Sequence, residues 1–189
     1  MRRVMVIPVY YSRPKSEGHQ DGDSVYDHPT PIDEDGTLKR TLESIRIIKN
    51  QDFQLVILVS PTSEELTDRA KEKVNKILSE VNLDIQTFIF TPAELEKIKA
   101  LATEQDVEKS VIKLMNIRGY ANVRNMCIYT AYILGAEMAM LIDDDELFEK
   151  DDFVDLASQY IGGRLYGKTI DGVAGYYLNK YGNYYDDVD

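Results

Sequence analysis

The sequence is poor in cysteine and in basic residues. Its single cysteine, Cys127, excludes a disulfide within the chain, and the apolar helical pattern around it favours a buried structural thiol over a catalytic one. With 22 basic against 33 acidic residues, the formal net charge is −11 at pH 7. This charge repels a phosphate backbone, so we expect no nucleic-acid partner. It remains compatible with nucleotides, because a divalent cation can bridge carboxylates to phosphates.

Long apolar runs and targeting signals are also missing. No stretch approaches the roughly 20 apolar residues of a transmembrane helix, so no transmembrane segment is expected. Arg2 and Arg3 precede an apolar stretch, but Pro8 interrupts it and no small-residue cleavage site follows. A cytoplasmic location is therefore the default expectation. The length of 189 residues, without internal repeats, suits one compact domain over residues 1–189.

Apolar segments typical of strands alternate with amphipathic segments typical of helices. The predicted strands cover residues 3–10, 53–60, 84–90 and 137–142, and the predicted helices cover 37–50, 62–81, a segment opening at Thr91, and 119–134. Capping boxes are predicted at Thr62–Glu65 and Thr91–Glu94. Apolar strands that are each followed by a helix indicate an α/β fold, with a mostly parallel sheet covered by helices on both faces.

Two segments depart from this regular alternation. Residues 11–36 form a long polar connection, and connections of that length are usually functional or disordered. The tail after Gly175 is dense in tyrosine and aspartate and ends abruptly for an α/β enzyme. We therefore expect a missing C-terminal, acceptor-binding part or a homo-oligomer. For the tail tyrosines we expect strand packing or an interface with such a partner, and the alternative is a sugar-stacking platform; they stand at 176, 177, 181, 184 and 185.

Three consecutive aspartates, Asp143, Asp144 and Asp145, follow the last predicted strand. Ligands of open α/β sheets bind at the carboxyl ends of strands, and clustered carboxylates suit Mg²⁺ or Mn²⁺. Residues two apart in an extended segment face the same side, so Asp143 and Asp145 are predicted to converge on one ion while Asp144 points elsewhere. The alternative is a solvated turn before a helix near Asp151. A buried strand leading into the cluster favours the metal, because like charges repel without a cation.

The residues before this cluster form a wider pattern. A glycine and an alanine precede an arginine–asparagine pair, a small-residue helix, a glycine–acid step and an apolar strand ending in Asp-x-Asp. The matching positions are Gly119, Ala121, Arg124, Asn125, Ala131, Gly135, Glu137 and Asp143–Asp145. This pattern resembles family 2 glycosyltransferases. Residues 6–10 and 37–45 resemble that family's first strand and first helix, so the resemblance covers about residues 3–150.

The resemblance implies a GT-A fold and a metal-dependent, inverting transfer of a sugar from a nucleotide-diphosphate sugar to the hydroxyl of an acceptor that the sequence does not identify. By this resemblance, Asp143 and Asp145 hold Mn²⁺ or Mg²⁺ against the donor diphosphate, and Asp144 contacts ribose or sugar. Arg124 reaches a phosphate or the donor sugar, a role that suits its planar charged fork. The alternative for Arg124 is a surface or helix-capping cation.

The resemblance also places Pro8 and Tyr10 beside the nucleotide base, where Tyr10 stacks; its alternative role is ordinary core packing. Residues 59–62, Val-Ser-Pro-Thr, stand where family members carry an acid that recognises the base. The general base is unassigned, since no spacing selects among Asp171, Asp186 and Asp187.

Two other functions compete with the glycosyltransferase hypothesis. A nucleotidyltransferase uses similar folds and carboxylates, but the first strand is not followed by a glycine-rich, basic phosphate loop. A non-catalytic binding or interaction domain with a retained GT-A fold agrees with the short C-terminus and with the missing base-binding acid.

Overall fold

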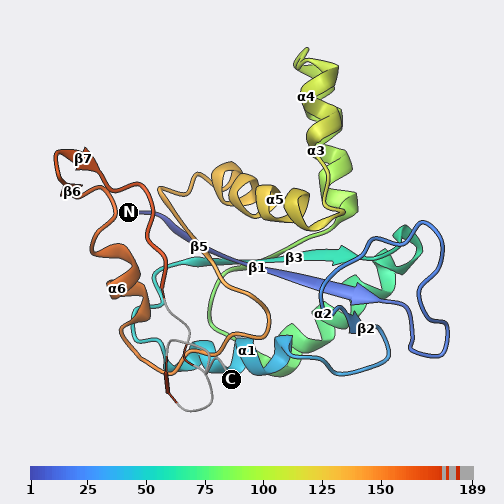
Figure 1. The fold of residues 1–189 in the computed structure, drawn as a ribbon, viewed down its shortest axis with the longest axis horizontal. Helices are drawn as coiled ribbons and strands as arrows, with labels where there is room; N and C mark the ends of the chain where they lie inside the picture. Colours follow the sequence, from blue (N-terminus) through green and yellow to red (C-terminus); the bar gives the residue numbers. More distant parts are fainter. Residues whose placement is uncertain (176–177, 179–181, 184–189) are drawn as a thin grey trace.

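The computed structural model describes residues 1–175, 178 and 182–183 of the chain (Figure 1). The first half contains β1 (Arg3–Ser12), β2 (Thr30–Pro31), α1 (Leu38–Ser44), the 3-10 turn η1 (Ile45–Ile47), β3 (Gln54–Pro61), the 3-10 turn η2 (Glu64–Leu66), α2 (Thr67–Val81) and β4 (Thr87–Phe90). The second half contains α3 (Pro92–Glu104), α4 (Lys109–Leu114), α5 (Tyr120–Ile133), β5 (Met138–Leu141), α6 (Phe153–Ser158), β6 (Arg164–Leu165) and β7 (Lys168–Thr169).

Strand β1 lies at the centre of a five-stranded sheet whose pairings are all parallel. On one side of β1 the order continues through β3 to β4. On its other side, β5 pairs with Arg3–Val6, and β2 pairs with Tyr11 and Ser12. A separate antiparallel pair joins β6 to β7. The predicted α/β class with a mostly parallel sheet is therefore confirmed.

Helices cover both faces of this sheet, as Figure 1 shows with α1 and α2 below it and α5 above it. Successive side chains of a strand point to opposite faces. Met5 and Ile7 accordingly join the core formed with α1 and α2, whereas Val4 and Val6 join the core formed with α5. All four are fully buried, which explains why β1 reads as an unbroken apolar run.

One of the two predicted capping boxes is confirmed. At the start of α3, the Thr91 side chain accepts from the backbone N–H of Ala93, and the Glu94 carboxylate accepts from the backbone N–H of Thr91. The box predicted at Thr62 is wrong, because α2 begins only at Thr67. Thr62 instead extends the β1–β3 pairing, since its N–H donates to the carbonyl of Tyr11 at 2.8 Å.

The prediction of a fully buried last strand is half right. In β5, Met138 and Met140 are buried on the α1 face, but Ala139 and Leu141 are exposed. The chain reaches β5 through Gly135, which adopts φ +70° and ends α5. A Cβ on Gly135 would lie 2.6 Å from an Arg2 side-chain nitrogen, so glycine suits both the turn and the close approach.

Helices α3 and α4 form a hairpin that projects from the body of the molecule (Figure 1). Leu95, near the start of α3, is the residue of this hairpin that reaches the core, and α4 buries no residue fully. The sequence analysis did not predict this hairpin. Within residues 1–175, 178 and 182–183, no helix is long and apolar enough to cross a membrane. The tail tyrosines at 176, 177, 181, 184 and 185, and Asp186 and Asp187, lie outside the described residues.

Candidate functional site at the carboxyl end of the sheet

The order of the strands switches direction beside the carboxyl end of β1. From β1 the chain first builds β3 and β4 on one side, and it later returns to the other side of β1 with β5. Such a switch in strand order leaves an opening between the loops that leave neighbouring strands, where open α/β sheets bind ligands. Here the switch point lies between the ends of β1 and β5. The predicted aspartates lie directly at this point.

Pro8 lies where β5 stops pairing with β1. The N–H of Ile142 donates to the carbonyl of Val6, which directs Val6 toward β5. Alternate residues of a strand direct their backbone groups to the same side, so Pro8 also faces β5. Proline has no N–H to continue the ladder, and β5 leaves β1 just there. Pro8 is buried and paired with Leu58 on its other side, so its observed role concerns the backbone.

Asp143 pairs with Arg124, which projects from the second turn of α5. One terminal nitrogen of the guanidinium, Nη2, donates to Asp143 Oδ2 at 2.8 Å and lies 2.6 Å from Oδ1. The contact with Oδ1 is too poorly aligned for a hydrogen bond. Oδ1 is consequently a buried oxygen without a hydrogen-bond partner in the described part of the chain. The pair neutralises Asp143 but leaves part of its hydrogen-bonding capacity unused.

Tyr120 holds the Arg124 guanidinium from a second direction. The guanidinium carbon lies 5.1 Å from the centre of the Tyr120 ring, and Nη2 also donates to the Tyr120 hydroxyl at 2.8 Å. Burial lowers the pKa of Arg124, but the hydrogen bonds to Asp143 and Tyr120 outweigh it and raise that pKa above its ordinary value. Arg124 is therefore a permanently charged group beside the carboxyl ends of β1 and β5.

Tyr10 packs between two other tyrosine rings. Its ring centre lies 4.6 Å from that of Tyr26 and 6.4 Å from that of Tyr120, nearly parallel to the latter at 20°. Its hydroxyl is buried and unpartnered among the residues that the structure describes. Burial raises the pKa of Tyr10, the nearby Arg124 lowers it and Asp143 raises it. A neutral phenol with an unused hydroxyl thus lies beside the Arg124–Asp143 pair.

Asp144 points to the opposite face of the sheet from Asp143. Its Oδ2 accepts from the Thr37 hydroxyl at 3.2 Å, and its backbone carbonyl accepts from the Thr41 hydroxyl at 2.6 Å. Burial raises the pKa of the carboxyl to about 6, against the Thr37 hydrogen bond, and the charges of Asp145 and Asp143 raise it further. Helix α1 therefore anchors the acidic turn through two threonines (Thr37 and Thr41).

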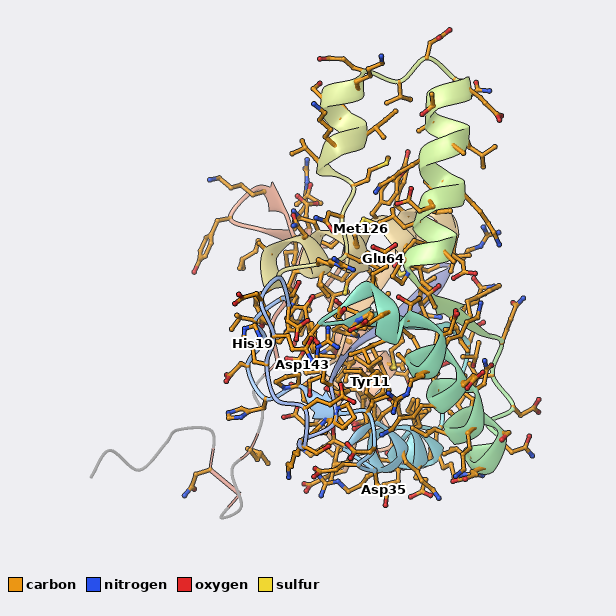
Figure 2. The ribbon with its side chains drawn as sticks, turned by 90° about the vertical axis from the view of Figure 1, so that its right-hand side faces the viewer. Tyr11, His19, Asp35, Glu64, Met126 and Asp143 are labelled. Atoms are coloured by element: carbon orange, nitrogen blue, oxygen red, sulfur yellow. The ribbon has the colours of Figure 1, made fainter. Side chains whose placement is uncertain are left out.

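Asp145 lies exposed in a turn that begins at Asp144. Glu146 closes this turn: its carboxylate accepts from the N–H of Asp143 at 2.9 Å, and its own N–H donates to the Asp143 carbonyl at 3.2 Å. Figure 2 looks toward the carboxyl ends of the strands and shows Asp143 at a height between α5 and α1. Over the described ranges, no three side chains of His, Cys, Asp or Glu come together in positions to hold a metal ion.

The long connection after β1 is tied to the same end of the sheet. The Tyr26 hydroxyl lies 2.7 Å from Ser60 Oγ and accepts from the N–H of Gly119 at 3.1 Å. Because Ser60 donates its own proton to the carbonyl of Ile117 at 2.6 Å, Tyr26 donates to Ser60. Tyr26 thus joins the connection both to the end of β3 and to the start of α5.

A cavity of about 320 Å³ lies within this connection, beside the end of β3. Its lining includes Arg13, His19, Tyr26, Pro29 and Thr62. Arg13 is largely neutralised, because its guanidinium pairs with Asp23 at 2.9 Å and also contacts Glu65. Thr62 is only 4% exposed, and its hydroxyl has no partner in the described part of the chain. Residues 59–62 stand where the resembled family carries a base-binding acid. Here this segment contributes neutral hydroxyls instead.

The structure brings three of the predicted residues together, namely Tyr10, Arg124 and Asp143. Pro8 lies in the same strand as Tyr10, where β5 stops pairing with β1. Asp144 is held on the other face, and Asp145 stays at the surface. The sequence analysis missed Tyr120 and Tyr26. Tyr120 stands four residues before Arg124, a helical spacing that places both on one face, so it was detectable. Tyr26 has no local signal, because its partners are distant in sequence.

No protein-family model, curated protein or solved structure matches this chain. The resemblance to family 2 glycosyltransferases is therefore untested and remains a prediction.

Proposed function

We propose that this chain binds a nucleotide-diphosphate sugar at the carboxyl ends of β1 and β5 and transfers the sugar to an acceptor hydroxyl, with a GT-A type of fold. The observation that carries the proposal is the Arg124–Asp143 pair at the point where the strand order switches. This point suits a ligand, and the pair offers a permanent cation and a carboxylate with one oxygen that accepts no hydrogen bond within the described residues. A diphosphate, together with a divalent cation, matches both charges.

The residues present fit a minimal site for Mn²⁺ or Mg²⁺. Such ions are commonly held by one or two carboxylates together with phosphate oxygens, so a group of three protein ligands is not required. Asp143 has a buried oxygen that accepts no hydrogen bond within the described residues, and Asp145 is exposed two positions later. These two aspartates would hold the cation. When bound, it would stabilise the negative charge of the departing nucleoside diphosphate.

In the proposed reaction, the acceptor oxygen bonds to the anomeric carbon as the bond from that carbon to the diphosphate oxygen breaks. The hydroxyl proton passes to a general base that is unassigned, and attack from the face opposite the leaving group inverts the anomeric centre. Arg124 would orient the diphosphate by charge-assisted hydrogen bonds. Tyr10 and Tyr120 would exclude water from the same side, because their rings pack beside the guanidinium.

A non-catalytic binding domain is the second candidate function. The observation in its favour is that Arg124 already neutralises Asp143, so the folded state does not need a cation at that carboxylate. Under this alternative the pair is a structural link between α5 and the turn after β5. Nucleotide sugars would then bind without turnover, or would not bind at all.

Release of nucleoside diphosphate from a panel of nucleotide sugars, in buffer with Mn²⁺, tests the proposal. Water serves as the default acceptor, and candidate acceptors are then added. We expect release with one nucleotide, and a loss of about a hundredfold in Asp143→Asn or Asp145→Asn. The matched control is Glu149→Gln, which removes one charge from an exposed position four residues beyond Asp145. Absence of release from the whole panel, in a folded sample, would contradict transferase activity.

A further inference from the structure

We infer that Arg124 is a built-in substitute for the cation at Asp143, and that an arriving metal–diphosphate complex displaces its guanidinium from Asp143 to the diphosphate. This inference rests on the proposed function and assigns Arg124 two successive partners. In the first state Arg124 pairs with Asp143, as the structure has it. In the second, Asp143 would hold the metal ion and Arg124 would turn to the phosphate.

The geometry at Asp143 supports this exchange. A single nitrogen of Arg124 approaches both carboxylate oxygens, at 2.8 and 2.6 Å, instead of the two-nitrogen fork that makes arginine–carboxylate pairs strong. One oxygen consequently remains without a hydrogen bond in the described part of the chain. The pair is also half open to solvent, with side chains 29% and 41% exposed. Water screens a pair exposed to this extent, so a divalent ion can compete with Arg124 for Asp143.

The surroundings of Arg124 would keep it at the site after it leaves Asp143. Its guanidinium lies over the Tyr120 ring, and Nη2 donates to the Tyr120 hydroxyl at 2.8 Å. Both residues belong to the same face of α5, so this contact does not depend on the acidic turn. The unpartnered hydroxyl of Tyr10 lies beside them and offers a further hydrogen bond. Arg124 therefore has a second support from which to reach a phosphate.

The two roles predict opposite effects of one substitution. Without nucleotide, Arg124→Gln removes the competitor of the metal ion, so Mn²⁺ alone should bind about fivefold more tightly, as expected for a half-exposed ion pair. With a nucleoside diphosphate present, the same substitution removes a phosphate ligand. The nucleoside diphosphate should then bind about tenfold more weakly in Mn²⁺. A residue with a purely structural role would not produce this reversal.

Titration of the full chain with Mn²⁺, followed by the electron paramagnetic resonance signal of the free ion, measures the first effect without any turnover. The matched control is Arg118→Gln, which removes an equal charge just before α5 from an arginine that contacts Glu64 at 3.5 Å. Arg118→Gln should bind Mn²⁺ like the wild type. The double variant Arg124→Gln/Asp143→Asn should lose the gain, and thermal unfolding should show that each variant is folded.

The outcomes separate this inference from the proposed function. In one outcome, the wild type binds nucleoside diphosphate in a Mn²⁺-dependent way, but folded Arg124→Gln binds Mn²⁺ no more tightly than the wild type and Arg118→Gln do. The proposed function then stands, and the inference that Arg124 takes the place of the cation is wrong. If no variant binds Mn²⁺, with or without nucleoside diphosphate, both are wrong. Tighter binding of Mn²⁺ alone together with weaker binding of nucleoside diphosphate supports both.

Discussion

Replacing Asp144 by asparagine is expected to stabilise the metal-free protein at neutral pH. The carboxyl is part-buried against α1, and burial raises its pKa from an ordinary 3.8 to about 6, against the hydrogen bond from Thr37. The folded protein therefore holds this proton more tightly than the unfolded chain does. The cost of ionisation is absent below about pH 3.8, grows between the two pKa values and is constant above about pH 6. An asparagine accepts the same Thr37 hydrogen bond without carrying that charge.

The size of the effect follows from the two pKa values. A rise from 3.8 to about 6 corresponds to about 3 kcal/mol of lost stability above pH 6. The side chain keeps some contact with water, which screens the charge, so we expect Asp144→Asn to raise the free energy of unfolding by about 2 kcal/mol at pH 8. At pH 4 the same substitution should change it by less than about 0.5 kcal/mol.

Urea unfolding at pH 4 and pH 8, in buffer with EDTA, measures both values. The matched control is Asp21→Asn, which removes the same charge from an exposed position in the long connection after β1. The difference in free energy of unfolding between this control and the wild type should not grow from pH 4 to pH 8 as it does for Asp144→Asn. If Asp144→Asn changes the free energy of unfolding equally at the two pH values, or destabilises the protein at pH 8, then ionisation of the part-buried Asp144 does not cost stability and the account is refuted.

Three further predictions concern the link to the long connection, the core and the thiol. Tyr26→Phe removes the hydroxyl that joins Ser60 and Gly119, and should cost about 1–3 kcal/mol in urea unfolding, with earlier proteolysis of the connection. Leu42→Ala, at a fully buried position of α1, should cost about 2–5 kcal/mol; a cost below 1 kcal/mol would contradict the packing of α1 on the sheet. Burial raises the pKa of Cys127 to about 12. Iodoacetamide at pH 8 should therefore alkylate this thiol far more slowly in the folded than in the urea-unfolded protein, and equal rates would contradict its burial.

The parallel sheet was predictable because its strands carry a local signal. Residues 4–7 and 55–59 are buried on both sides, and this burial is written into the sequence as continuous apolar runs. The start of α3 was equally predictable, since its capping box involves residues three apart. At Thr62 the same signature failed, because pairing with Tyr11 and Ser24 holds Thr62 in the strand direction. Tertiary pairing there outweighs a local preference.

The candidate site was predictable only in part. The position of the aspartates follows from the end of β5, and their separation onto two faces follows from the alternation along an extended chain. Their partners do not follow from spacing: Arg124 lies 19 residues before Asp143, and Thr37 lies 107 residues before Asp144. The tilted packing of Tyr10 against Tyr26 depends on how the long connection folds back, which no local pattern encodes.

Calorimetric titration of the protein with nucleoside diphosphates and nucleotide sugars, in Mn²⁺ and in EDTA, tests the central claim most directly. The account predicts that one nucleotide binds in Mn²⁺, that EDTA abolishes this binding, and that Asp143→Ala/Asp145→Ala abolishes it as well. Binding that is unchanged in EDTA and in the double variant would contradict a cation-dependent site at the end of β5. A folded wild-type protein that binds no nucleotide under either condition would contradict the nucleotide-sugar site itself.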